Sequence, residues 1–509
     1  MSEKRAIAKN TAINFARTVM SYGVRLFTMP IILNALGSSE YGTLVLVGSI
    51  MESSTLMQGG LGVPITKYVA EYLAKDDDEG LNRLVNSAFV VFVITGAAIV
   101  AVLLAFVLLL MNRVFHIPAD LQRPALIYAL IAVAVFGVNH VAALFGRLVE
   151  GAQRYDIQFR IEVVGLLAGP VATAVVAATG GGIIRIGVVT GSLTAVGLVI
   201  TIAMALRAAP GFRFDPRLAD RGEMKRMLPF SWRVFVTKVS SYLSDRFNPW
   251  IVGAFMPVSA LTFYNIADRI HQLARMPAAV TSITILPVTS GLDAKNERER
   301  VASLYVRAVK YTAAISLPVI LAGLVLADPV IRYWLGERFI SAVPMTRAYL
   351  SYLSIAVMIP VASQVLVGLE KLDKRLTRRI LGVTGVNLVV SVLLVRSIGT
   401  IGVIWGSVVG GILMWLVLTA RVVKELRVSP WRILKDAIIP TFGPAAVVYV
   451  PLWFLAGWFA PPNFIVTVLY GAAAMVLYEA AVVAVGFDAG ERASLRAYGA
   501  SLFRRLRGA

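Results

Sequence analysis

Ionisable side chains interrupt a few of the apolar stretches in this chain, and arginines are the most frequent of them. In the first stretch, polar residues recur every three or four positions, so a helix presents them on one face. Guanidinium groups bind phosphate and diphosphate through paired hydrogen bonds. The pattern therefore predicts a cationic site for an anionic ligand. The candidate residues are Arg17, Arg25, Glu52, Lys238, Asp245, Arg246, Asp268, Arg269, His271 and Arg275.

Structural roles are the alternative for several of these residues. Arg17 lies close enough to the end of its stretch for its charged head to reach the membrane interface. His271 is either a hydrogen-bonded packing residue or a proton-coupling site, since its ordinary pKa is near neutrality. Acid–base pairs can neutralise one another and hold helices together. The pairs in question are Asp245 with Arg246, and Asp268 with Arg269 and Arg275.

Motifs for catalysis are missing from the sequence. It has no phosphate-binding loop with its lysine, no His-Glu-x-x-His pair and no nucleophile elbow, and it contains no cysteine. The glycines at 59, 60 and 62 lie inside an apolar stretch and are a weak match to a nucleotide loop. We therefore predict that the protein is not an enzyme and has no catalytic residue, metal site or cofactor. Coupling to a proton or sodium gradient, or to the membrane potential, is expected instead.

The elements that position the charged residues are predicted to be transmembrane helices. Hydrophobic residues make up 58% of the chain and charged residues 15%, and the mean hydropathy is +0.76. The apolar runs are about twenty residues long, enough to cross a bilayer, and lack the alternation of a barrel strand. We predict an all-α membrane protein with about fourteen spans. They are 10–33, 40–65, 84–111, 122–149, 160–180, 183–206, 228–254, 258–289, 303–327, 345–368, 379–396, 401–420, 437–457 and 464–486.

Basic residues orient these spans. They gather in alternate loops and at both ends of the chain, as in the clusters at 213–226, 371–379 and 504–507. Because cytoplasmic loops accumulate lysine and arginine, both termini are predicted to be cytoplasmic, in the inner membrane of a bacterium. Loops of this kind face anionic lipid headgroups, so the net charge of +20 requires no nucleic-acid partner.

The segment 207–227 has the proline, glycine and charge content of a linker and divides the chain after six spans. The first two spans on each side of it share a tight turn, at 36–42 and at 255–259. Two similar six-helix lobes are a common transporter arrangement. The predicted parts are an N-terminal lobe at 1–206, the linker at 207–227, a C-terminal lobe at 228–420, a cytoplasmic loop at 421–436, two further helices at 437–486 and a basic tail at 487–509.

Short motifs are distributed over most of the chain. They include the turn at 36–42, the Gly60-Leu61-Gly62 end of the second span, and three later stretches around Asp245, Asp268 and Trp334. With these motifs the chain resembles the polysaccharide transporter (Wzx-type) branch of the multidrug/oligosaccharidyl-lipid/polysaccharide (MOP) superfamily of flippases and exporters. The later stretches are Ser244-Asp245-Arg246, Tyr264-Asn265-Ile266-Ala267-Asp268-Arg269-Ile270 and Trp334-Leu335-Gly336-Glu337-Arg338-Phe339.

The resemblance implies two six-helix lobes packed as a V around a cationic central cavity, which alternates between inward-open and outward-open states. It also implies a polyprenyl-diphosphate-linked glycan as substrate, with its sugars and diphosphate in the cavity and its chain in the bilayer. Membrane lipids and a polysaccharide polymerase are the other partners implied. The matching positions for a cavity role are Arg17, Arg25, Glu52, Asp245, Arg246, Asp268 and Arg269; His271 and Arg275 rest on the helical-face argument.

Other functions remain open on the sequence. A lipid II-type peptidoglycan precursor flippase has the same predicted span count. A cation-coupled multidrug antiporter of the same superfamily requires an acidic, apolar-lined cavity, and the arginines disfavour it. A membrane scaffold, glycosyltransferase or polymerase is the third class, but an enzyme of that kind needs a large loop with carboxylates. The longest predicted loop has only about twenty residues.

Overall fold

The structure is a computed structural model that describes residues 3–209, 211–227, 247–282, 284–493 and 497. These residues form helices and no β-strand. Ten of the described helices are long and apolar enough to cross a membrane, which confirms the all-α polytopic class. The chain divides into two compact units, Met1–Thr262 and Phe263–Ala509, called here the N-terminal unit and the C-terminal unit.

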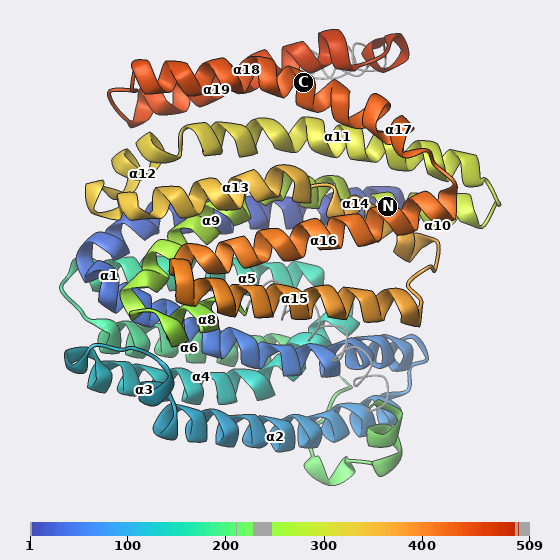
Figure 1. Ribbon diagram of the computed structural model, residues 1–509. Helices are drawn as coiled ribbons and strands as arrows, with labels where there is room; N and C mark the ends of the chain where they lie inside the picture. The colour runs from blue at the N-terminus through green and yellow to red at the C-terminus, as the bar shows by residue number, and fades with distance from the viewer. Residues whose placement is uncertain (1–2, 210, 228–246, 283, 494–496, 498–509) are drawn as a thin grey trace, which may run out of the picture. The chain divides into compact units, whose positions relative to one another are not determined.

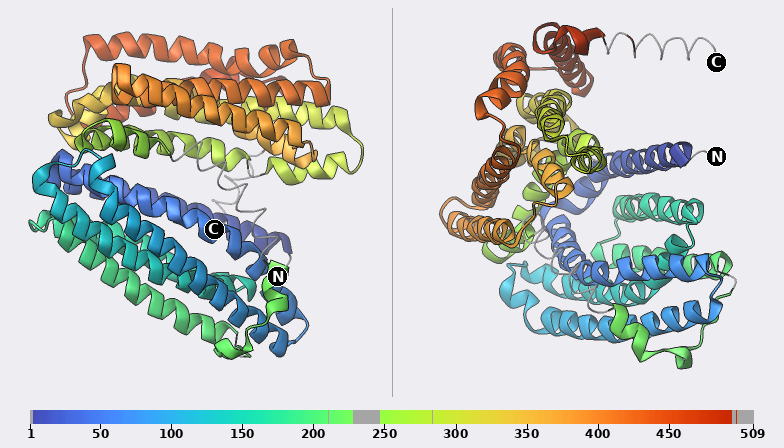
Figure 2. Two further views of the ribbon diagram at one scale, coloured as in Figure 1. Left: turned by 60° about the horizontal axis from the view of Figure 1, so that its bottom comes forward. Right: turned by 90° about the vertical axis from the view of Figure 1, so that its right-hand side faces the viewer.

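In the N-terminal unit, α4 packs against α2 on one side and α6 on another, and α1 packs against α4 and α5 (Figures 1 and 2). The long apolar runs of the sequence become these helices because their backbone groups are satisfied internally. The elements are α1 (Glu3–Ala74), α2 (Asp78–Leu109), α3 (Met111–Val114), α4 (Ala119–Gly151), α5 (Tyr155–Ala178), α6 (Ile183–Ala208), η1 (Pro216–Leu218) and α8 (Asn248–Phe255).

The turn predicted at 36–42 is confirmed, because α1 is two helices joined at Gly37. The backbone there has φ +73° and ψ 179°, a conformation that glycine adopts without a Cβ clash. Nearby, Thr262 Oγ1 donates a hydrogen bond of 2.6 Å to the carbonyl of Ser38. The second predicted turn, at 255–259, is also confirmed, since α8 ends at Phe255 and the next helix begins at Val258.

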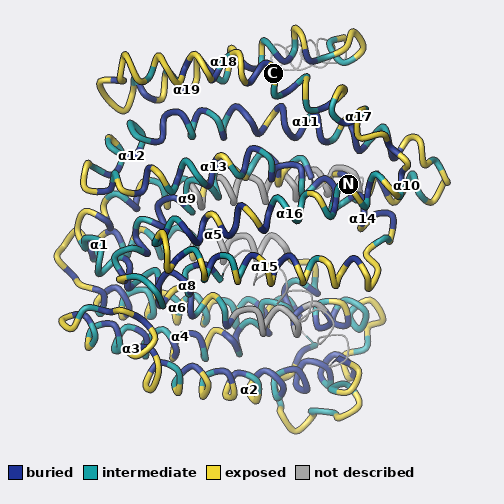
Figure 3. The backbone as a smooth tube through the Cα atoms, viewed as in Figure 1, coloured by how far each residue is buried: buried dark blue, intermediate teal, exposed yellow. Residues whose placement is uncertain are grey.

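The C-terminal unit continues with shorter helices. Figure 3 shows many exposed residues on α18 and α19, and Trp458 at the end of α18 is 80% exposed. The boundary between the units falls inside α9 (Val258–Ser282), after Thr262. The elements that follow are α10 (Ile285–Asp293), α11 (Arg298–Val325), α12 (Ala327–Leu335), η2 (Glu337–Ala342), α13 (Val343–Ala356), α14 (Ile359–Gly368), α15 (Lys374–Ile398), α16 (Thr400–Leu426), α17 (Pro430–Ile433), η3 (Leu434–Ile438), α18 (Ile439–Trp458), α19 (Phe464–Ala481) and η4 (Val482–Gly486).

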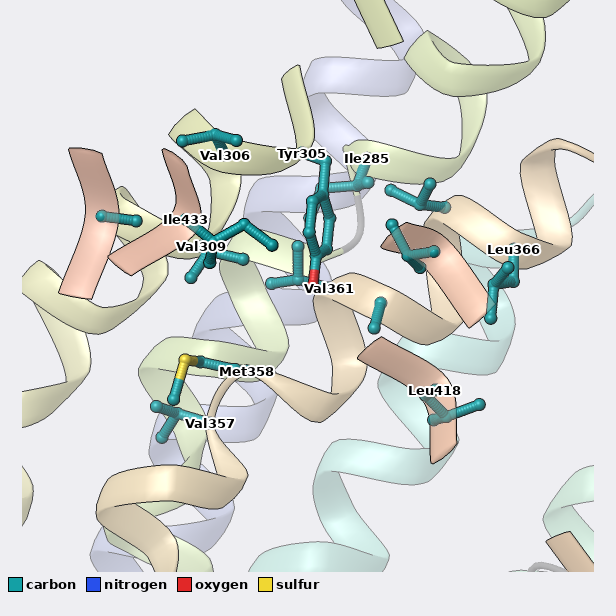
Figure 4. Close-up of a cluster of buried hydrophobic side chains, with 14 of the residues drawn as sticks. Ile285, Tyr305, Val306, Val309, Val357, Met358, Val361, Leu366, Leu418 and Ile433 are labelled. Atoms are coloured by element: carbon teal, nitrogen blue, oxygen red, sulfur yellow. The ribbon is translucent and has the colours of Figure 1, made fainter. Parts of the chain in front are cut away.

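A large buried cluster holds the C-terminal unit together around α11. In Figure 4 the ring of Tyr305, which is 1% exposed, lies beside the aliphatic side chains of Ile285 and Val361. Burying such side chains stabilises each by about 1.5–3 kcal/mol relative to exposure. The cluster therefore fixes α11 against α10 and α14.

Two predicted spans are interrupted in the structure. The span 258–289 breaks between α9 and α10, and the span 345–368 breaks between α13 and α14. Pro287 and Pro360 lie in the first turn after each break. Proline has no backbone N–H to donate to the carbonyl four residues earlier, so a continuous helix loses a hydrogen bond at these points.

Three glycines of α16, at 406, 410 and 411, lie where neighbouring helices approach closely. A Cβ added at Gly406 would lie 2.0 Å from Ser391 Oγ, and one at Gly411 would lie 2.1 Å from Tyr352 Cε2. These glycines let α16 approach α15 and α13 closely. The predicted lobe boundaries and the total of fourteen spans stay predictions, because much of the span 228–254 lies outside the described residues.

Candidate functional site

The N-terminal unit contains a cavity of about 1020 Å³. Residues of α1, α4, α5 and α6 line it, and Glu52 on α1 and Asn139 on α4 are its most polar side chains; both are exposed. Most of the wall is aliphatic, aromatic or glycine, as in Val47, Met51 and Phe136. No lysine or arginine is among the described residues that line it. Among the predicted site residues whose side chains the structure describes, Glu52 is the one that lines this cavity.

A second cluster lies in the C-terminal unit, where α9 meets α13. Gln272 Nε2 donates a hydrogen bond of 2.5 Å to Asp268 Oδ2, and His271 Nδ1 lies 4.0 Å from Asp268 Oδ1. The His271 ring stacks on Tyr349 with the two ring centroids 4.7 Å apart. Tyr349 in turn shares a hydrogen bond of 2.7 Å with Tyr264. The structure therefore brings the predicted residues Asp268 and His271 together, with Gln272 beside them.

The other predicted residues are distributed differently. Arg25 is exposed on α1 and Arg275 is exposed on α9, whereas Arg269 is half-buried. Arg17 lies on α1, but its side chain is outside the described part of the structure. The remaining three predicted residues lie outside the described residues altogether. They are Lys238, Asp245 and Arg246.

Several polar residues escaped the sequence prediction. Lys310 on α11 is 6% exposed, and its Nζ lies 2.6 Å from Glu491 Oε2. The sequence did contain a signal for Lys310, because it is a lysine inside the predicted span 303–327. Arg347 on α13 packs over the ring of Trp453 on α18, with its Cζ 4.7 Å from the ring centroid. Asn139 carried no sequence signal, because a lone amide in an apolar run is common at helix packing surfaces.

Comparison with known proteins assigns the family. A sequence profile described as "Polysaccharide biosynthesis protein" matches residues 36–344, more than half of the chain. The chain belongs to this polysaccharide biosynthesis protein family. No curated protein matches the chain.

The fold of this family member is that of MOP superfamily transporters. The lipid II flippase MurJ in an inward closed conformation aligns with a TM-score of 0.68 and 14% identity, covering 91% of this chain and 97% of MurJ. An inward-facing multidrug resistance MATE transporter aligns with a TM-score of 0.65 and 16% identity, covering 82% of this chain and 98% of the transporter. A MOP transporter from Pyrococcus furiosus aligns with a TM-score of 0.53 and 15% identity, covering 82% of this chain and 95% of that protein. It is described as having a binding pocket of reverse polarity.

These comparisons bear on the sequence predictions in two ways. The family resemblance is confirmed at the level of the polysaccharide biosynthesis protein family, and the chain, with ten candidate membrane spans among its described residues, has the fold of the MOP transporters to which it is similar. The structure also supplies an apolar-lined cavity with a carboxylate, which the sequence prediction expected only for a drug antiporter. The predicted cationic cavity between the lobes stays a prediction.

Proposed function

We propose that the protein is a flippase that moves a polyprenyl-diphosphate-linked oligosaccharide from the cytoplasmic to the outer leaflet by alternating access. The substrate would be the repeat unit of an O-antigen, capsule or exopolysaccharide. The observation that carries the proposal is the polysaccharide family match over residues 36–344 on a chain with a transporter fold. A glycan made in the cytoplasm on a polyprenyl diphosphate must cross the membrane before it is polymerised outside.

Arginines are the residues that we assign to the diphosphate. Arg25 and Arg275 are exposed on α1 and α9, and Arg269 is half-buried on the same helix as Arg275. A guanidinium group forms two parallel hydrogen bonds with a phosphate, and each charge-assisted bond is stronger than a neutral one. In this mechanism the arginines hold the diphosphate while the helices rearrange, and an ion gradient or the membrane potential drives the cycle. Both termini are cytoplasmic, as the loop charges indicate.

The test is flipping by the purified protein in liposomes that contain a fluorescent polyprenyl-diphosphate oligosaccharide. Arg25→Ala and Arg275→Ala should each lower the flipping rate at least tenfold, since a lost charged hydrogen bond costs about 1.5–3 kcal/mol. Arg298→Ala is the matched control, because Arg298 is an exposed arginine at the start of α11 and has no assigned contact with substrate. Normal flipping by both Arg25→Ala and Arg275→Ala would contradict the assignment.

Export of hydrophobic cations is a second candidate function, and the N-terminal cavity favours it. Glu52 places one carboxylate in an apolar wall that has no basic side chain among its described residues. A cation with apolar groups matches such a wall, and a carboxylate can exchange it for a proton. Efflux of a dye such as ethidium from liposomes, lost in Glu52→Gln, would support this function. If the same liposomes show no flipping of the glycan lipid, the flippase function is wrong.

A further inference from the structure

The glycines of the N-terminal cavity face open space. A Cβ added at any of five lining glycines meets no heavy atom within 4 Å outside its immediate chain neighbours. By contrast, a Cβ at Gly187, which also lines the cavity, would lie 2.7 Å from the ring of Tyr128. The five open positions therefore enlarge the cavity, whereas Gly187 permits helix contact. The open glycines are Gly48, Gly146, Gly165, Gly169 and Gly197.

The threonines of the cavity wall add little hydrogen-bonding capacity. Thr190 Oγ1 donates to the carbonyl of Ile186 at 2.7 Å. Thr194 and Thr201 do the same on α6, each to the carbonyl four residues earlier at 2.8 Å. A hydroxyl whose proton is engaged by its own helix does not donate it to a ligand. The wall therefore offers a ligand mainly apolar surface.

The charge of the cavity is wrong for a diphosphate. Glu52 is its one described acidic residue, and no described lysine or arginine lines it. A diphosphate placed there would meet a like charge and no described guanidinium group, whereas α1 and α9 carry the exposed arginines Arg25 and Arg275. The head group of the proposed substrate must therefore bind elsewhere. A hydrocarbon chain, which has no charge and no hydrogen-bonding group, suits this wall.

We propose that the cavity between α1, α4, α5 and α6 binds part of the isoprenoid chain of the lipid-linked substrate. This inference rests on the proposed flippase function. It places part of the isoprenoid chain in a binding site inside the protein, with the rest in the bilayer. The volume of about 1020 Å³ is at the upper end of small-molecule sites, about 300–1,000 Å³. Met51 and Met204 line the cavity as well, and their flexible side chains can adapt to a methyl-branched chain.

The first experiment uses the unaltered protein. A polyprenyl diphosphate with a photoactivatable diazirine on its chain is added to proteoliposomes, irradiated, and the labelled peptides are mapped. The expected result is labelling of α4, α5 and α6 peptides around Asn139, Gly169 and Gly197, reduced by excess unlabelled polyprenyl diphosphate. Labelling confined to other helices would overturn the proposal.

The second experiment fills the cavity. Gly169→Leu and Gly197→Leu introduce side chains into open space, so the fold has room for them. Together they should lower cavity labelling roughly tenfold, the effect of losing about two buried methylene groups. Gly443→Leu is the control, because Gly443 on α18 is exposed and a Cβ there also meets nothing within 4 Å. Its labelling should equal that of the unaltered protein.

Flipping separates this inference from the function on which it rests. If the protein flips the glycan lipid and the filled variants flip it normally with unchanged labelling, the chain does not use the cavity and the flippase function stands. If a photoactivatable hydrophobic cation labels the cavity peptides and the prenyl probe does not, and no flipping occurs, both proposals are wrong. If flipping is slower and labelling of the cavity weaker in the filled variants but not in Gly443→Leu, the result supports both the flippase function and the isoprenoid site.

Discussion

The two units hold polar segments against their helices in chemically different ways. In the N-terminal unit, residues 211–227, here the linker segment, pack against α2 through neutral side chains, whereas in the C-terminal unit residues 487–492, the tail segment, pack against α11 through an ion pair. The central residue is Asn86 in the first attachment, at 0% exposure, and Lys310 in the second, at 6% exposure. Both units thus hold a polar segment on a helix, one mainly through neutral amides of α2 and the other through a buried ion pair.

Neutral amides on α2 replace the backbone partners that the linker segment lacks. Asn86 Nδ2 donates to the carbonyl of Arg213 at 3.0 Å, and its Oδ1 accepts from the amide of Asp215 at 3.0 Å. Asn82 makes the equivalent pair with Gly211 and Arg213, at 2.9 and 2.5 Å. Because residues 211–215 are not helical, these amides satisfy backbone groups that would otherwise be buried without partners.

Further contacts extend this attachment to α1. The Tyr72 hydroxyl donates to Glu223 at 2.5 Å, and the Arg226 guanidinium lies 4.1 Å from the centroid of the Tyr68 ring. Burial, together with the Glu223 carboxylate, raises the pKa of Tyr72 to about 12, so the hydroxyl keeps its proton and remains the donor. The segment predicted as a linker is therefore a fixed part of the N-terminal unit.

The tail segment depends on charge. Lys310 Nζ and the Tyr311 hydroxyl donate to the two oxygens of Glu491, at 2.6 and 2.8 Å. Glu491 and Asp488 also cap each other, since each backbone amide donates to the other's carboxylate, at 2.7 and 2.8 Å. A buried ion pair adds little over an apolar pair of the same shape, but removing one partner leaves a costly uncompensated charge. A single substitution should therefore lower the free energy of unfolding more in the charged attachment than in the neutral one.

The largest expected effect comes from Lys310→Met, which leaves Glu491 buried without its cation. We expect a loss of about 3–5 kcal/mol and a fall in Tm of roughly 10 °C, measured by thermal unfolding in detergent. The double variant Lys310→Met/Glu491→Met should recover most of the loss, because it removes both charges. A double variant as unstable as the single one would show that the pair itself stabilises the fold.

A smaller effect is expected from Asn86→Leu, which keeps the side-chain size and removes the hydrogen bonds to Arg213 and Asp215. Leaving these backbone groups unsatisfied costs about 1–3 kcal/mol. Because trypsin cuts the open form, cleavage within the linker segment should become at least fivefold faster. Asn112→Leu, at an exposed asparagine, is the control. Equal cleavage rates in the two variants would mean that the amides do not hold the segment.

The sequence was sufficient for the helices and turns, because apolar run length and Gly37 are local signals. It was insufficient for these attachments and for the cavity, because each depends on distant partners. Lys310 was visible as a lysine in an apolar span, yet its partner lies 181 residues away. Likewise, Gly197 and Gly406 look alike in sequence. One faces open space and the other meets Ser391, a difference that only the neighbouring helices determine.

The smallest expected effect is the pH response, which distinguishes the two attachments directly. Burial alone raises the pKa of Glu491. Hydrogen bonds from Lys310, the backbone amide of Asp488 and Tyr311 outweigh this, so the pKa lies below its ordinary value. A carboxylate with a lowered pKa stabilises the fold fully above its unfolded pKa, about 4.3, and this stabilisation is lost as the pH falls through the folded value. The tail segment should therefore loosen below about pH 4.

Spin labels can report this loosening, since the chain contains no cysteine to interfere. A label at Ala489→Cys should gain mobility below about pH 4, whereas one at Ala219→Cys in the linker segment should change less, because Asn82, Asn86 and Ser87 do not titrate. In a Glu491→Gln background the tail label should be mobile at every pH, since the titrating charge is gone. A tail label that loosens near neutral pH, or one that keeps its pH response without Glu491, would mean that another group controls the attachment.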